Sequence, residues 1–313
     1  MPRDRLNWND LRYFLEVART GRLLGAARRL AVNHATVGRR IDALEQALAV
    51  KLFVRDEQGY HLTPAGEDLL PLAQQVEDVT GLARERSSSP PHSLSGSVRI
   101  GTPDGFGNAF LAGNLARFLD AHQELRIELL SIPLTHNLKK REVDLAISLE
   151  PSDNRDIHCE KITDYRLQLF ASADFLHRHG IAPDDFDAIT RHTFADYITD
   201  ILYTEQLSFN RRIRPGLRNR LQSATVQAQY EFIAHGGGFG VLPNYMGDHD
   251  PRLVPVLTER VSFIRAYWLL IPLELRRLAR IRGLERFILA TARERRDLFL
   301  PPALTDPTGI AAQ

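Results

Sequence analysis

Residues 33–40 (NHATVGRR) bring small, hydrogen-bonding and cationic side chains together in one short stretch. Apolar residues then recur at spacings of four, three and four, which predicts an α-helix with one apolar face. Thr36 and Arg39 lie away from that face, where a hydroxyl and a guanidinium can hydrogen-bond to base edges in the major groove of DNA. The acids Asp42 and Glu45 follow only later, so this helix is suited to enter a groove with its N-terminus first.

A second helical pattern precedes this one. Residues 23–30 (LLGAARRL) place apolar and small side chains on one face, and residues 31–33 form the turn, with Asn33 as the N-cap of the second helix. The stretch from Arg19 to Arg55 contains eight Arg or Lys residues and two acidic residues, a local net charge of +6. An ordinary helical hairpin with a solvated basic face would show the same pattern.

The flanking segments favour a winged helix-turn-helix over an ordinary hairpin. Residues 8–19 predict a first helix behind Asn7 that shares a core with the hairpin. Residues 52–63 (LFVRDEQGYHLT) predict two short strands around a turn, a wing that would bring cations to the phosphate backbone. The candidate DNA-binding residues of the helix and the wing are Asn33, His34, Ala35, Thr36, Gly38, Arg39, Arg40, Lys51 and Arg55.

A long helix is predicted from Pro64, because Thr63 is a good N-cap and proline is favoured at the first helical position. Its apolar residues recur at spacings of four and three, as in a coiled coil, which predicts a dimer seam. A helix packed on its own domain would also show this stripe, and Pro71 should kink the helix. Residues 87–93 (SSSPPHS) then form a linker. The seam contains Leu69, Leu72, Val76 and Val79.

Together these motifs closely resemble the N-terminal domain of LysR-type transcriptional regulators. The resemblance is strongest over residues 6–70, with the runs AARRL, HATVGRRIDALEQALAVKLFVR and GYHLTPAGEDLL, and it continues moderately over the rest of the chain. The sequence departs from the family pattern at four positions. In the recognition helix, Gly38 stands where the family usually has a hydroxyl residue, and Ala49 stands where a glycine usually ends that helix. Arg22 replaces the usual serine cap, and Pro71 lies in the linker helix, where the family usually has no proline.

The resemblance implies a sequence-specific DNA-binding transcriptional regulator, modulated by a small-molecule effector that binds between two α/β lobes. The implied partners are double-stranded DNA, the effector and further copies of the chain in a homodimer or homotetramer, and a contact with RNA polymerase stays open. No cofactor is implied. The alternatives are a constitutive architectural DNA-binding protein and an enzyme fused to a DNA-binding module. We do not expect an enzyme, since the sequence has no nucleophile elbow, HExxH motif, Walker lysine or dinucleotide fingerprint.

Composition sets further bounds. The chain has 313 residues, 43% of them hydrophobic and 25% charged, and a formal net charge of +1, so a nucleic-acid role belongs to the basic N-terminal region. Cys159 is the only cysteine, which excludes an internal disulfide and suits a reducing cytoplasm. No apolar run is long enough for a membrane span, so we expect a cytoplasmic protein without a membrane partner. The spacing of the histidines predicts no metal site.

The region after the linker alternates predicted strands and helices, which indicates an α/β fold with a mostly parallel sheet covered on both faces. The glycine-rich segment 235–247 follows a helix and precedes a strand, so we interpret its glycines as a helix end and a turn rather than a phosphate loop. The predicted strands lie at residues 97–101, 126–132, 143–149, 166–171, 240–242 and 266–271.

This organisation predicts three functional segments and a tail. A winged helix-turn-helix covers residues 1–63, and a dimerisation linker helix with a hinge covers 64–95. An effector-binding domain covers 96–300, and residues 301–313 form a tail. The resemblance implies that the effector domain has a periplasmic-binding-protein fold with crossings near Tyr165 and Arg265. Its lobes would then be formed by residues 96–164 with 266–300 and by residues 165–265.

In an open α/β sheet, ligands bind beyond the carboxyl ends of the strands. The first strand of this domain ends at Thr102, and a helix starting near Gly107 would aim its N–H groups and its positive dipole end at that point. We therefore expect a small anion or polar metabolite there, unless Thr102 only caps the helix. Asp104 would repel a strong anion unless it turns outward, so a neutral or cationic ligand is the alternative.

The resemblance adds effector contacts after the second strand, at the end of the third strand, and in the second lobe before the glycine-rich segment. The candidate effector-binding residues are Thr102, Pro103, Asp104, Leu134, Thr135 and Ser148.

Overall fold

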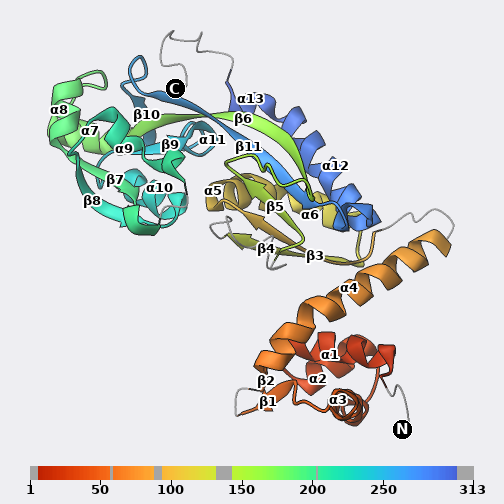
Figure 1. The fold of residues 1–313 in the computed structure, drawn as a ribbon. Helices are drawn as coiled ribbons and strands as arrows, with labels where there is room; N and C mark the ends of the chain where they lie inside the picture. The colour runs from red at the N-terminus through yellow and green to blue at the C-terminus, as the bar shows by residue number, and fades with distance from the viewer. Residues whose placement is uncertain (1–5, 57–58, 88–93, 132–142, 202–203, 302–313) are drawn as a thin grey trace. The chain divides into compact units, whose positions relative to one another are not determined.

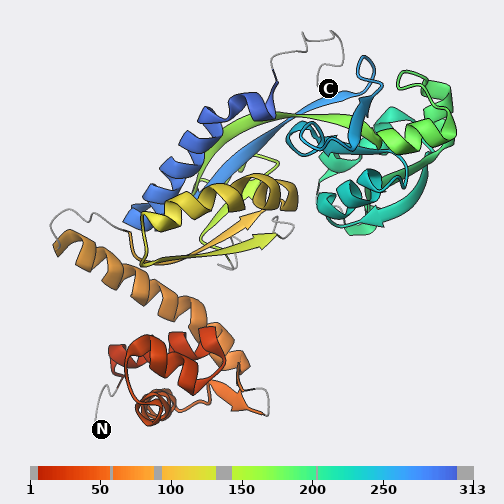
Figure 2. The same cartoon turned by 180° about the vertical axis from the view of Figure 1, so that it is seen from behind.

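The chain folds into two compact units, Met1–Pro91 and His92–Gln313 (Figures 1 and 2). The computed structural model describes residues 6–56, 59–87, 94–131, 143–201 and 204–301. None of the helices in these ranges combines the length and the hydropathy needed to cross a bilayer. Leu134 and Thr135 lie outside the described residues.

The first unit contains three helices, a two-stranded hairpin and a long final helix, which confirms the elements that the sequence predicts. All three expected N-caps are formed: Oδ1 of Asn7 accepts from the N–H of Asn9 at 3.0 Å, Oδ1 of Asn33 from the N–H of Ala35 at 2.9 Å, and Oγ1 of Thr63 from the N–H of Gly66 at 3.1 Å. The elements are α1 (Trp8–Thr20), α2 (Leu23–Leu30), α3 (His34–Leu48), β1 (Phe53–Arg55), β2 (Tyr60–Leu62) and α4 (Pro64–Ser87).

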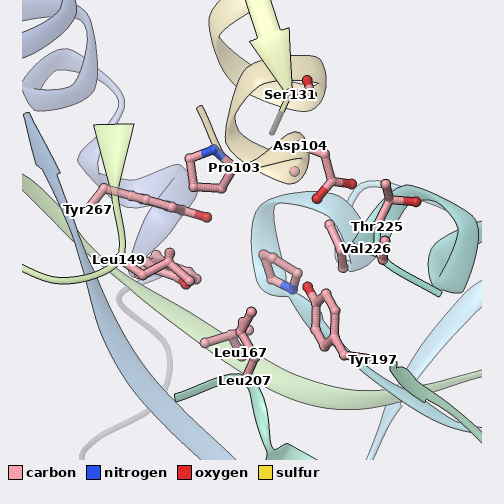
Figure 3. Close-up of a pocket in the computed structure, with 14 residues that line it drawn as sticks. Pro103, Asp104, Ser131, Leu149, Leu167, Tyr197, Leu207, Thr225, Val226 and Tyr267 are labelled. Atoms are coloured by element: carbon pink, nitrogen blue, oxygen red, sulfur yellow. The ribbon is translucent and has the colours of Figure 1, made fainter. Parts of the chain in front are cut away.

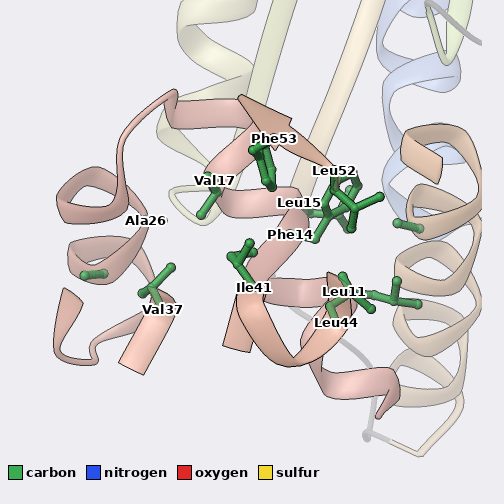
Figure 4. Packing of buried hydrophobic residues seen from close by; sticks show 12 residues of the cluster. Leu11, Phe14, Leu15, Val17, Ala26, Val37, Ile41, Leu44, Leu52 and Phe53 are labelled. Atoms are coloured by element: carbon green, nitrogen blue, oxygen red, sulfur yellow. The ribbon is translucent and has the colours of Figure 1, made fainter. Parts of the chain in front are cut away.

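Apolar side chains from every helix of this unit meet in one core (Figure 4). Phe14 of α1 and Val37 of α3 are fully buried, and the ring of Phe14 lies 5.3 Å from the ring of Phe53 in β1. Full burial of such a side chain contributes about 1.5–3 kcal/mol. Ala73 of α4 is buried in the same cluster, so the first turns of the long helix belong to this domain.

A close backbone approach fixes where the long helix begins. A Cβ atom on Gly66 would lie 2.3 Å from the carbonyl oxygen of Leu52, so only glycine fits there. Thr63 holds the same segment, because its hydroxyl donates to the carbonyl oxygen of Lys51 at 2.7 Å and its N–H donates to that of Leu52 at 3.0 Å. The helix then continues through Pro71 without interruption, although proline has no N–H to donate to the preceding turn.

A buried carboxylate joins α3 to the hairpin. Glu45 is 6% exposed, and its Oε1 accepts from the backbone N–H groups of Leu52 at 2.9 Å and Phe53 at 3.3 Å, while its Oε2 accepts from Nζ of Lys51 at 2.5 Å. Burial raises the pKa of Glu45, but the hydrogen bonds from Lys51 and from the two backbone groups together lower the pKa below its ordinary value. Glu45 is therefore a structural residue and not only an acid at the far end of the helix.

The second unit is built on a seven-stranded sheet with the strand order β10-β6-β11-β5-β3-β4, and β9 also pairs with β6. β3 is parallel to β4 and β5, whereas β11 is antiparallel to β5 and β6, and β9 and β10 are antiparallel to β6. The prediction of a mostly parallel sheet is wrong for this sheet, because its two longest strands run in opposite directions. Its strands are β3 (Gly96–Thr102), β4 (Leu125–Ser131), β5 (Leu145–Ser148), β6 (Ile157–Ser172), β9 (Gly240–Pro243), β10 (Leu253–Val256) and β11 (Ser262–Pro272).

β6 and β11 connect the two halves of this unit and run from one α/β body into the other (Figure 1). They pair from Ser262 opposite Gln168 to Pro272 opposite Ile157, with a register shift between Tyr267 and Trp268. Tyr165 and Arg265, which the sequence places near the crossings, are partners in this register.

The sequence did not predict β7 (Thr193–Tyr197), β8 (Arg218–Ser223) or β10. β7 and β8 form a separate parallel pair, and most residues of β8 are polar, so β8 lacks the apolar pattern of a buried strand. The interpretation of the glycine-rich segment is confirmed: the segment follows α10 (Val226–Ala234), contains the positive-φ residues Gly236 and Gly238, and leads into the buried strand β9.

The helices of the second unit surround these sheets (Figures 1 and 2). After β3 and Pro103, one continuous helical segment changes from α to π and back to α geometry. The helices are α5 (Asp104–Phe106), η1 (Gly107–Leu111), α6 (Ala112–Asp120), α7 (Ala173–His179), α8 (Phe186–Arg191), η2 (Thr199–Ile201), η3 (Glu205–Leu207), α9 (Phe209–Ile213), α10, α11 (Asn244–Gly247), η4 (Leu275–Arg277), α12 (Ala279–Glu294) and α13 (Arg296–Phe299).

Ala49 ends α3 in the left-handed region, with φ of 55°, where an L-residue is disfavoured by about 1–2 kcal/mol and glycine is not. We expect Ala49→Gly to raise the free energy of unfolding of the first unit by up to about 1 kcal/mol, since the extra chain entropy of glycine offsets part of the gain. Ala47→Gly is the matched control, because it lies inside the same helix and should destabilise by about 0.5–1 kcal/mol. Thermal or urea unfolding measures both, and the same sign for the two variants would contradict the explanation.

Glu45→Gln should lower the free energy of unfolding of the first unit by about 1–3 kcal/mol at neutral pH, because the charged acceptor is lost. The folded-state pKa of Glu45 is lowered, so the contribution is fully present above the unfolded pKa of about 4.3 and is lost as the pH falls through the folded value. The difference in free energy of unfolding between wild type and Glu45→Gln should therefore narrow only below about pH 5. Hydrogen exchange of core amides, with the exposed-acid variant Asp42→Asn as control, measures it. A gap that does not change with pH would contradict the role of the charge.

Candidate DNA interface and ligand cavity

The N-terminal half of α3 presents the expected residues to solvent. Asn33, His34, Ala35 and Arg39 are exposed, and Thr36 is half-buried. Nη2 of Arg39 lies 3.4 Å from Oγ1 of Thr36, so a guanidinium and a hydroxyl share one side of the helix. This arrangement offers adjacent donors to the edges of neighbouring bases.

Gly38 leaves room for a side chain on this helix. A Cβ atom there would lie 3.6 Å from Cδ1 of Leu23, which is ordinary van der Waals contact. Packing therefore does not require glycine at this position, and its main effect is to remove a side chain from the half-exposed flank of the helix.

Two of the candidate DNA-binding cations have partners within the domain. Nη1 of Arg40 lies 3.3 Å from Oδ1 of Asp10, which is buried, and its guanidinium lies 5.9 Å from the ring centroid of Tyr13. Lys51 is paired with Glu45, as described above, although its side chain is 75% exposed. Both cations thus contribute to the fold, which the sequence did not reveal because their partners lie on other elements or past a turn.

The wing carries Arg55 at the exposed end of β1, opposite Tyr60 in the register of the hairpin. Asp56 shapes the turn beyond it: its N–H donates to the carbonyl oxygen of Gly59, and its Oδ1 accepts from the N–H of Gly59, both at 3.0 Å. A side chain at this place can reach a phosphate while α3 occupies the groove.

The apolar stripe of α4 is divided between two directions. Leu69 and Val76 are half-buried against the core of their own domain, whereas Leu72 is 56% and Val79 is 64% exposed. The sequence could not separate the two sets, because a period of 3.5 residues fits self-packing as well as pairing. Only the second set is free to form a seam with another chain.

An ion pair holds α4 against α1. Arg19 donates from Nη2 to Oε2 of Glu77 at 2.6 Å and from Nη1 to Oε1 at 3.1 Å, and it also bonds Glu16 at 3.0 Å. Burial lowers the pKa of Arg19, but these carboxylates together raise it above its ordinary value. The bidentate geometry fixes the orientation of α4 on the domain.

A cavity of about 90 Å³ lies in the second unit between the start of α5, the start of α10 and the central strands (Figure 3). Its wall is mainly apolar and aromatic. The polar ends of Asp104, Tyr197 and Tyr267 point into the same space (Figure 3). The lining residues are Pro103, Asp104, Gly105, Ser131, Leu149, Tyr165, Leu167, Tyr197, Leu207, Ala224, Thr225, Val226, Pro243 and Tyr267.

Asp104 does not turn outward. Its Oδ2 accepts from the backbone N–H of Gln227 at 3.0 Å, across the cavity in the first turn of α10. The helical segment after β3 begins at Asp104 and not near Gly107, so the predicted start is wrong by three residues. An acid is favoured in a first helical turn, which explains why Asp104 lies inside the helix.

The other candidate effector residues are placed differently from one another. Pro103 lines the cavity together with Asp104. Thr102 is fully buried, its hydroxyl donates to the carbonyl oxygen of Pro103 at 3.1 Å, and it is not among the lining residues. Ser148 accepts from the N–H of Glu150 at 3.1 Å, and its neighbour Leu149 lines the cavity in its place.

The tyrosines of the cavity were missed in the sequence. Tyr165 and Tyr267 come from β6 and β11, and their rings stack with centroids 4.1 Å apart and an interplanar angle of 11°. Their positions at the predicted crossing were the available signal, since a residue where the chain passes between lobes also borders the space between them. Burial raises the pKa of both phenols, so they stay neutral.

A separate cluster joins β6 to α12. Nε2 of His158 lies 3.2 Å from Oε2 of Glu160 and 3.3 Å from Oε1 of Glu285, a grouping that histidine spacing did not reveal. Nε of Arg276 also contacts both oxygens of Glu285, at 3.0 and 3.2 Å. Arg276 therefore compensates the charge of Glu285 within the protein.

Two domain families of LysR-type proteins match the chain, one in each unit. The family of bacterial regulatory helix-turn-helix proteins, lysR family, matches residues 8–67, and the LysR substrate binding domain matches residues 91–293. The HTH-type transcriptional regulator HdfR of Yersinia pestis (strain Pestoides F) is 28% identical over 269 residues, which are 83% of this chain and 89% of that protein.

Solved structures show the same fold. CrgA, a LysR-type transcriptional regulator from Neisseria meningitidis, has a TM-score of 0.56 and 21% identity, covering 92% of this chain and 99% of that one. The probable transcriptional regulator PA0477 from Pseudomonas aeruginosa has a TM-score of 0.69 and 17% identity, covering 93% of this chain and 97% of that one. With a winged helix-turn-helix, a linker helix and a two-bodied α/β unit in this order, the chain belongs to the LysR-type transcriptional regulators.

Proposed function

We propose that this regulator reads its operator with Thr36 and Arg39 and holds the phosphate backbone with Arg55 and Lys51. The observation that supports the proposal most is the pairing of the Arg39 guanidinium with the Thr36 hydroxyl on the exposed side of α3. Asn33, His34, Ala35 and Gly38 line the same end of the helix and set how closely it approaches the bases. Arg40 contributes mainly by orienting α3, since it is paired with Asp10.

We further propose that the chain acts as a dimer paired through α4, or as a tetramer in which two such dimers associate through the second units. Leu72 and Val79 are exposed and seven residues apart, which is the spacing of a coiled-coil seam. Two recognition helices would then face half-sites separated by one or more helical turns, about 10–10.5 base pairs each. A small-molecule effector would bind in the cavity next to Asp104.

The proposed place of action is the cytoplasm, where the operator DNA lies. A contact with RNA polymerase is a further proposal that the family membership permits. The general function, that of a DNA-binding transcriptional regulator with an effector-binding domain, follows from membership of the family.

Arg39→Ala should cost about 1–3 kcal/mol of binding to an operator selected from random DNA and should relax the preference at one base position. Arg55→Ala should weaken operator and scrambled DNA alike and lower the slope of log K against log salt by about one. Titrations on both DNAs at several salt concentrations measure the difference. Arg12→Ala is the control, since it removes the same charge from the exposed side of α1. Equal losses on both DNAs for Arg39→Ala would exclude base reading.

The double change Leu72→Glu, Val79→Glu should weaken dimerisation and operator affinity together, because it places four carboxylates in the seam of a dimer. It should leave the unfolding temperature of the first unit nearly unchanged, because both side chains are exposed. Leu69→Ala, which removes a half-buried contact with the core, should instead lower stability by about 1–2 kcal/mol. Sedimentation equilibrium and thermal unfolding distinguish the two effects, and an unchanged oligomer for the double variant would remove α4 as the seam.

A further inference from the structure

We propose that the cavity of the second unit takes a cationic or uncharged ligand with an aromatic or apolar body, because Asp104 already occupies the place at the start of α10 that a ligand anion would take. The inference rests on the proposed role of this cavity as the effector site. It reverses the preference for an anion that the helix after β3 suggested in the sequence.

The first step is the contact between Asp104 and α10. The N-terminus of a helix favours an anion because its first N–H groups have no partner within the helix. In α10, the N–H of Gln227 donates to Oδ2 of Asp104 at 3.0 Å, and the N–H of Ala228 donates to Oγ1 of Thr225, the N-cap, at 3.4 Å. The protein thus supplies its own carboxylate at this helix end, and a ligand carboxylate would have to displace it.

The second step is that close packing fixes Asp104 in this place. A Cβ atom on Gly105 would lie 2.7 Å from Cγ1 of Val226, so the start of α5 and the start of α10 touch directly beside the carboxylate. The backbone of Asp104 belongs to α5, and its carboxylate accepts a hydrogen bond from the N–H of Gln227 in α10. This packing brings the carboxylate within reach of the Gln227 N–H, and the hydrogen bond orients it toward α10.

The third step is the charge of the wall. Among the lining residues that the structure describes, Asp104 is the only charged one, and the wall contains no described Lys, Arg or His. An anion placed there would meet a fixed carboxylate and no described cation. An ammonium group would meet one carboxylate at close range, which is the favourable pairing.

The fourth step is the shape and chemistry of the remaining wall. Tyr165 and Tyr267 offer stacked, neutral rings, and the phenol of Tyr267 is hydrogen-bonded to that of Tyr245 at 2.7 Å. Aromatic faces beside a carboxylate are the surroundings in which organic cations bind. Leu149, Leu167 and other apolar residues complete the wall. The volume of about 90 Å³ restricts the part of the ligand inside the cavity to a small body, of about one aromatic ring at most.

The test uses the full chain and three probes that share one body and differ in charge: 2-phenylethylamine, 2-phenylethanol and phenylacetate. Calorimetry and thermal-shift titrations should show that the amine and the alcohol bind and that phenylacetate binds at least about tenfold more weakly than the amine. Asp104→Asn should weaken the amine about tenfold and leave the alcohol unchanged, because the amide oxygen can still accept from Gln227. Phenylacetate binding to wild type as tightly as the amine, or no binding of any probe, would overturn the inference.

A second variant separates this inference from the proposed site. Ala224→Trp fills the cavity from an exposed position on its rim, so it should abolish binding of the amine while the fold persists. If the amine binds to Ala224→Trp as it does to wild type, the ligand sits elsewhere and the proposed effector site fails. If Ala224→Trp abolishes binding but wild type prefers phenylacetate, the site stands and only the ligand class is wrong.

Discussion

The antiparallel pair of β6 and β11 is the constraint on which the second unit depends. Both α/β bodies are attached to it, and its strands contribute Tyr165, Leu167 and Tyr267 to the cavity wall. The register shift falls directly after Tyr267, and such an irregularity re-aims side chains next to functional sites. The strands that hold the halves together therefore also shape the space between them, so a ligand in that space contacts the connection itself.

In the first unit, hydrogen bonds and ion pairs define how the DNA-facing parts are held. Glu45 ties α3 to the start of β1, Asp10 holds Arg40, and Glu77 holds Arg19. All three acids neutralise cations or satisfy backbone donors inside the domain. The basic charge left for DNA is consequently smaller than the count of Arg and Lys residues suggests. Among the described candidate residues, Arg39 and Arg55 have no ion pair with a carboxylate, whereas Lys51 shares its charge with Glu45.

The features that could be predicted from the sequence depend on contacts between residues close together in the chain. Helix starts at Asn33 and Thr63 follow from side chains that reach a backbone group within three residues, and those caps are formed. The polar strand β8 and the mixed direction of the main sheet depend on pairings between segments far apart in the chain, which no local pattern specifies. The same holds for the candidate sites: the exposed end of α3 was recognised, whereas the tyrosines of the cavity and the internal partners of Arg40 and Lys51 depend on tertiary contacts.

The burial of Ala73 and the ion pair between Arg19 and Glu77 make α4 a rigid extension of the DNA-binding domain. In a dimer paired through α4, the separation of the two recognition helices is then set by the register of that pairing. A shift by one heptad moves each domain by about 10 Å along the helix axis, roughly a third of the ~34 Å repeat of DNA. In such a dimer the spacing of the two recognition helices would change only in steps of one heptad, so no step would match an insertion or deletion of a single base pair between half-sites.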